Sequence, residues 1–132
     1  MTTRRRHGDE GTSAIELVLY MPLLMIAILL TVQFSLVYLG KEAASAAARE
    51  AARVARVTGD PAQGEAKGVS YAADLGRGVL DGVSVSVVAV PGEQVRATVT
   101  GTAPELLPAF LGVSEVTEVV QGPIERFEED AP

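Results

Sequence analysis

Glu16 is the residue whose position most clearly calls for a chemical explanation. It is the only charged residue in GTSAIELVLYMPLLMIAILL, residues 11–30. An ionised acid at the centre of a bilayer costs about 2.5–3.5 kcal/mol on insertion scales, less near the interface, and is usually paired. Position alone favours a carboxylate that reaches into the lipid headgroups. A functional role would require a partner for it.

Few other residues offer chemistry. His7 is the only histidine, and no nucleophile pattern lies near it; the absence of cysteine excludes thiolates, disulfides and cysteine zinc sites. No calcium loop or phosphate-binding glycine loop is present. A solvated tail explains the last acidic residues better than a weak cation site does; these are Glu125, Glu128, Glu129 and Asp130. We therefore expect no catalytic residue, metal or cofactor, and a protein that is not an enzyme.

The net charge of -6 is concentrated in the distal part of the chain. From residue 58 onward there are four basic and twelve acidic residues. Phosphate contacts need clustered Lys and Arg, so we expect no nucleic-acid partner.

Residues 17–40 form an uncharged apolar segment of 24 residues. A helix of this length spans about 36 Å, enough for a hydrocarbon core of about 30 Å. A cleavable secretory signal would have a shorter hydrophobic part, about 7–15 residues, although Ala43-Ala44-Ser45 resembles a cleavage site. The sequence thus predicts a single-pass membrane protein.

The orientation follows from the flanking charges. Arg4, Arg5 and Arg6 precede the span and favour a cytoplasmic N-terminus. The basic residues after the span nearly balance them. The short N-terminal segment and the acidic distal part favour a cytoplasmic N-terminus and an extracytoplasmic C-terminal domain.

The helical pattern continues beyond the membrane into KEAASAAAREAARVARV, residues 41–57, which is rich in alanine. One helix from about Ser13 to Val57 would be about 67 Å long. Its outer half carries a narrow seam of small residues. This seam could cover the protein's own small domain or pack against helices in an assembly; the two roles are compatible, and the sequence supports them about equally.

A second helix is predicted after residue 58. Gly59 suits a C-terminal cap, Asp60 an N-cap, Pro61 the first helical position, and Gln63 a capping box. The residues expected on its apolar face are Ala62, Ala66, Val69, Ala73 and Leu80. Three glycines would let the helix lie close to a neighbour: Gly64, Gly68 and Gly76.

After the second helix, the apolar residues recur at every second position, which is the period of a β-strand. Valines 83, 85 and 87 alternate with serines, Pro91-Gly92 forms a turn, and Val95, Ala97 and Val99 alternate again, which predicts a hairpin. Residues 104–112 form a proline-bracketed connector with up to one helical turn. Residues 116–124 suggest a third strand, interrupted near Gly122-Pro123. The predicted fold class is α+β: a long membrane helix, a second helix and a small antiparallel sheet, with residues 58–132 as the outer domain.

The N-terminal residues resemble the class III signal of type IV pilin-like proteins. RRRHGDEG is followed by TSAIE and then LVLYMPLLMIAILL, that is, basic residues, a glycine, a glutamate five residues later and an apolar helix. The proline in the span and the Ala/Arg helix AAREAARVARV resemble TadE-like minor pilins or pseudopilins of the tight-adherence (Flp-type, type IVb) pilus system. The resemblance covers residues 4–57.

This resemblance implies a function. Prepilin peptidase would remove residues 1–11 by cutting between Gly11 and Thr12, which leaves residues 12–57 as the N-terminal helix of the mature protein. Glu16 would pair with the new α-amine of a neighbouring subunit, and Pro22 would kink the helix. The implied partners are the peptidase, other pilin or pseudopilin subunits, assembly-platform proteins and the membrane, with roles in adhesion or secretion.

Two alternatives to a minor pilin remain. The first is an uncleaved single-pass protein whose extracytoplasmic domain binds a partner. The second is the major pilin of the same system, but such pilins are usually much shorter, and the α+β domain argues against this assignment.

Overall fold

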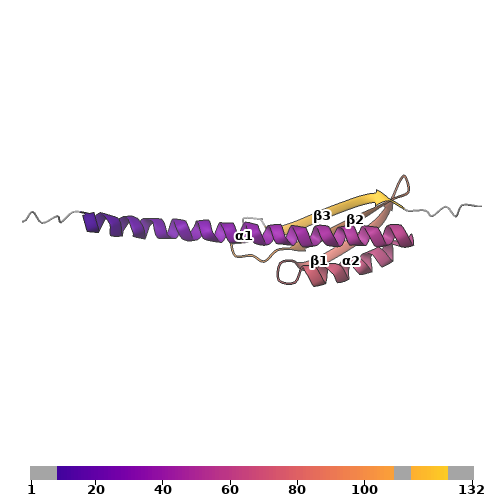
Figure 1. Cartoon of the computed structure of the whole chain (residues 1–132), viewed down its shortest axis with the longest axis horizontal. Coiled ribbons are helices and arrows are strands. Elements are labelled where there is room, and N and C mark those ends of the chain that lie inside the picture. Colours follow the sequence, from indigo (N-terminus) through magenta and orange to yellow (C-terminus); the bar gives the residue numbers. More distant parts are fainter. Residues whose placement is uncertain (1–8, 109–113, 125–132) are drawn as a thin grey trace, which may run out of the picture.

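A computed structural model shows a long helix joined to a small globular part. Helix α1 (Asp9–Thr58) is followed by α2 (Pro61–Leu75) and by strands β1 (Asp81–Val90), β2 (Gln94–Thr102) and β3 (Glu115–Pro123). The strands form one antiparallel sheet in the order β1-β2-β3. Half of α1 lies along the sheet and α2, and the other half projects away from them (Figure 1). The predicted α+β class is confirmed.

The structure describes residues 9–108 and 114–124, and the side chains within these ranges from residue 13 onward. The arginines of the N-terminus, His7 and the acidic tail from Glu125 lie outside the described residues. So do residues 109–112 of the predicted connector.

Helix α1 is continuous over 50 residues, or about 75 Å. It begins four residues before the predicted start at Ser13 and ends one residue after Val57. Two polar side chains within the apolar stretch bond to their own helix: the Thr31 and Ser35 hydroxyls donate to the carbonyls of Ala27 and Thr31, each at 2.8 Å. These bonds satisfy both hydroxyls without an outside partner, so they are compatible with a lipid environment.

The outer half of α1 packs on the protein's own domain. Seven of its alanines are buried against α2 and the sheet: Ala43, Ala44, Ala47, Ala48, Ala51, Ala52 and Ala55. A side chain larger than alanine in this seam would hold the layers apart. The sequence left two roles open for this seam. The structure shows that the seam packs against the protein's own domain.

Helix α2 approaches α1 through two of the three predicted glycines, Gly64 and Gly68, whereas Gly76 lies beyond the helix end against Ala72 and Leu80. A Cβ added at Gly64 would lie 2.6 Å from the carbonyl oxygen of Ala51 and 2.8 Å from the Cβ of Ala55. One added at Gly68 would lie 2.8 Å from the Cβ of Ala51. Only residues without a side chain permit this distance between the two backbones.

The predicted apolar face of α2 was wrong. The buried residues of this helix are Gly64, Gly68 and Ala72, whereas Ala62, Ala66, Val69 and Ala73 are exposed and Leu80 lies beyond the helix end. The spacing of apolar side chains predicted the wrong face of α2, because glycines form most of the surface that contacts α1. Close backbone contact with α1 outweighed side-chain hydrophobicity.

The junction between the helices is capped largely as predicted. Gly59 has φ +70°, and its N–H donates to the carbonyl of Ala55 at 2.9 Å, which closes α1. Asp60 Oδ1 accepts from the Ala62 N–H at 2.9 Å. The capping box differs, since Gln63 donates to the Asp60 carboxylate and the Asp60 N–H donates to the Thr58 hydroxyl instead.

The predicted hairpin is confirmed, with Val85 opposite Val99 and Val87 opposite Ala97. Its turn is one residue longer than Pro91-Gly92, because Gly92 (φ +89°) and Glu93 (φ +56°) both adopt left-handed backbone. Strand β3 continues through Gly122 and ends at Pro123, so the predicted interruption is the end of the strand.

Two side chains fasten the helices to the sheet. The Arg56 Nε donates to the Pro123 carbonyl at 2.7 Å, which ties the end of α1 to the end of β3. The carboxylate of Glu65 on α2 accepts from the Val87 N–H at 2.9 Å, which pairs a backbone group at the outer edge of β1. The globular part and the outer half of α1 thus form one packed unit.

Candidate membrane and assembly segment

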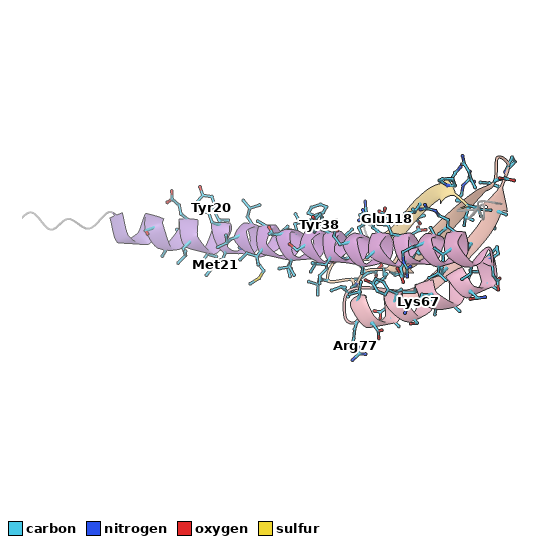
Figure 2. The ribbon with its side chains drawn as sticks, turned by 45° about the vertical axis from the view of Figure 1, so that its right-hand side comes forward. Tyr20, Met21, Tyr38, Lys67, Arg77 and Glu118 are labelled. Atoms are coloured by element: carbon cyan, nitrogen blue, oxygen red, sulfur yellow. The ribbon has the colours of Figure 1, made fainter. Side chains whose placement is uncertain are left out.

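The N-terminal half of α1 has almost no tertiary contacts. In residues 13–32, which we call the free segment, every side chain is exposed except the partly exposed Leu29. Figure 2 shows Tyr20 and Met21 projecting from this segment, far from the globular part. The helix Ser13–Thr58 contains a window with a mean hydropathy of 2.4, none of it buried. By length and composition this helix fits a single-pass membrane protein.

Glu16 lies near the start of the free segment and is exposed. Among the residues that the structure describes, none forms a hydrogen bond or ion pair with it. Position 12 lies four residues earlier in α1, and positions four apart share a helix face. The fold therefore places Glu16 on the same face as the predicted new N-terminus.

The predicted cleavage site lies in the first turn of α1. Because the helix begins at Asp9, the Gly11–Thr12 peptide bond is helical rather than extended. The first N–H groups of a helix have no intrahelical partner, and helix ends fray. Opening this turn would expose the bond without disturbing any packed side chain that the structure describes.

Pro22 lies within α1, which continues on both sides of it. Together with Leu17, Val18, Met21 and Met25 it forms a bare apolar surface. The kink expected at Pro22 stays a prediction.

The structure adds a residue that the sequence reasoning missed. Gln33 follows the free segment directly and is only 1% exposed. Its side-chain nitrogen donates to the Pro104 carbonyl at 3.2 Å, and its side-chain oxygen accepts from the Leu106 N–H at 2.8 Å. An amide within an uncharged apolar run was the available signal, because such a group needs a partner. Residues 104–108 are not helical.

The outer half of α1 carries one well-formed ion pair. The Arg53 guanidinium donates to both carboxylate oxygens of Glu50, at 2.7 and 2.8 Å. These hydrogen bonds lower the pKa of Glu50 from its ordinary 4.5, assisted by the positive charges of Arg53 and Lys67 and partly opposed by burial. The pair lies beside the domain, well away from the free segment.

No arrangement for catalysis is evident in the described part of the chain. No group of three or more His, Asp or Glu side chains there could hold a metal ion. An open hollow of about 370 Å³ is lined by Leu39, Glu42, Ala43, Leu75, Arg77 and Val79. It is mostly apolar and brings together neither a nucleophile and a base nor a pair of carboxylates.

Comparison with known proteins identifies the N-terminal part. The family described as TadE-like protein matches residues 11–53, which contain the free segment, Gln33 and most of the alanine seam. No curated protein and no solved structure matches the chain. Over these residues the chain is similar to the TadE-like family, which is associated with the tight-adherence pilus.

Proposed function

We propose that this protein is a minor pilin or pseudopilin, cleaved by prepilin peptidase between Gly11 and Thr12. The mature protein takes part in assembly of a tight-adherence pilus or a related secretion apparatus, as a structural subunit and not as an enzyme. The observation that carries the proposal is the free segment: a bare apolar helix with one acid near its start, within the TadE-like residues and attached to a folded domain.

The free segment needs a surrounding medium that its own domain does not provide. Before assembly that medium is lipid, since the backbone groups inside a helix bond to one another and most of the side chains of this segment are apolar. In a filament the same surface packs against helices of other subunits. The exposed side chains of residues 13–32 are therefore suited to both states.

Cleavage would supply Glu16 with a counterion, which the described residues do not provide. The α-amine of Thr12 would be a cation at the membrane surface, within the same helical turn as Glu16. A carboxylate near the first turn also interacts favourably with the positive end of the helix dipole. In an assembly, the amine of one subunit pairs with Glu16 of its neighbour, which sets the register of the two helices.

The test is N-terminal sequencing of the membrane-associated protein from cells with and without prepilin peptidase. We expect a chain that begins at Thr12 only where the peptidase is present. Gly11→Leu should abolish cleavage, because glycine permits the close backbone approach that the peptidase requires. Gly8→Leu, a matched change three residues earlier, should leave the cut in place. An intact leader in both strains would support the uncleaved single-pass alternative.

A further inference from the structure

The globular part meets α1 at Gln33, the first buried side chain among those that the structure describes on this helix. Between Glu16, the only charged residue of positions 11–30, and Gln33 lie 16 uncharged residues, which rise about 24 Å of the roughly 30 Å of a hydrocarbon core. Residues 104–108 of the connector, which Gln33 holds, therefore lie near the level where the helix leaves the hydrocarbon.

The connector is held firmly at this level. Gln33 binds it through two hydrogen bonds, to the Pro104 carbonyl and the Leu106 N–H. The Ala103 N–H donates to the Ser114 carbonyl at 2.8 Å, and the buried Ser114 hydroxyl donates to the carboxylate of Glu105. In Figure 1 the connector reaches farthest along α1 towards the free segment. These bonds pair the Pro104 carbonyl, the Leu106 N–H and the Glu105 carboxylate, while the Leu106 side chain stays exposed.

The surface around the connector has the composition of a membrane interface. Leu106 is 48% exposed. On α1, just after the C-terminal end of the free segment, Phe34 and Tyr38 are 59% and 63% exposed. Lys41 and Arg77 are exposed, and Figure 2 shows Arg77 at the end of the domain that faces the free segment. Aromatic side chains favour the headgroup level, and long basic side chains extend to the headgroups.

We propose that residues 104–108 rest in the interfacial layer of the bilayer on the side of the globular domain, with Leu106 inserted among the acyl chains. Gln33 is the residue that fixes this height. The occupant is lipid, because the connector is continuous with the membrane span through Gln33 and contains no basic side chain suited to an acidic protein partner. The inference concerns the membrane-inserted chain and does not depend on cleavage at Gly11.

The test uses the full-length chain in vesicles of phosphatidylethanolamine and phosphatidylglycerol. The chain has no cysteine, so single-cysteine variants can be labelled with an environment-sensitive fluorophore. Leu106→Cys reports on the connector and Met25→Cys on the span. Val88→Cys is the matched control, since Val88 is 46% exposed and lies on β1 near the hairpin turn. Emission is quenched either by nitroxide-bearing lipids or by aqueous iodide.

We expect lipid nitroxide to quench most of the emission at positions 25 and 106 and little at position 88, and iodide to show the reverse. Gln33→Leu should shift the label at position 106 towards iodide accessibility while circular dichroism stays unchanged. Ser35→Ala should leave it in the lipid. Equal quenching at positions 106 and 88 would overturn the proposal. So would protection of position 106 from both quenchers, which would indicate that a second copy of the chain covers the connector.

Discussion

At the scale of single residues, Glu16 carries the proposed assembly function. It has no packing role, since its side chain is exposed and the described residues supply no partner. In the proposed function, leader cleavage and the assembly contact depend on different residues, Gly11 and Glu16. Their effects should be separable by substitution.

Replacing Glu16 tests this separation. Glu16→Ala should leave the mature N-terminus at Thr12 but reduce the amount of the chain in isolated pili or in the cross-linked assembly, because the new amine loses its partner. Glu16→Asp keeps the charge and should retain part of the incorporation. Quantitative immunoblotting of membrane and assembly fractions provides the measurement. Full incorporation of Glu16→Ala would show that the amine pairing is wrong.

The Glu50–Arg53 pair gives a prediction for pH dependence. Because the folded-state pKa of Glu50 is lowered from 4.5, the pair stabilises the fold above that value, and the contribution is lost as the pH falls through the lower, folded-state pKa. An exposed pair of this kind contributes about 0.2–1 kcal/mol. Denaturant unfolding of Glu50→Gln and the wild type should therefore differ slightly at neutral pH and converge in acid. A difference that persists at the lowest pH would contradict this assignment.

At the scale of elements, the packing of α2 on α1 depends on the absence of side chains. In an exposed helix position, Gly→Ala stabilises by about 1 kcal/mol through helix propensity. At Gly64 the added Cβ would lie 2.6 Å from a backbone oxygen, so the helices must move apart. Overpacking typically costs about 1–3 kcal/mol, which outweighs the propensity gain.

We therefore expect Gly64→Ala to lower the unfolding free energy of the domain. Ser70→Ala, on the exposed face of the same helix, should change it by no more than about 0.5 kcal/mol. Chemical denaturation of the detergent-solubilised chain, followed by circular dichroism, compares the two. A Gly64→Ala variant more stable than the wild type would show that the helices separate easily.

The elements themselves were largely predictable from the sequence. The apolar run, the alanine-rich continuation, Gly59, Asp60 and the alternating valines each carry a local signal, and each formed the expected structure. The contact face of α2 was not predictable from hydrophobicity, because glycines make it. The partners of Gln33 were not predictable either, since Pro104 and Leu106 lie more than 70 residues away along the chain.

At the scale of the whole molecule, the chain is a long helix with a small domain packed along its C-terminal half (Figure 1). The domain has no disulfide, because the chain has no cysteine. Its core is made by the alanine seam of α1, the glycines of α2 and the valines of the sheet. Since α1 supplies much of this core, the domain and the outer half of α1 form one packed unit. The free segment is left to contact lipid or neighbouring subunits.

The most direct test of the account is the N-terminal sequence of the chain recovered from purified pili or from the cross-linked assembly. Processing and incorporation are both required for the predicted result, a sequence that begins Thr-Ser-Ala-Ile-Glu. Recovery of the chain with residues 1–11 still attached, or only outside the assembly, would contradict the account.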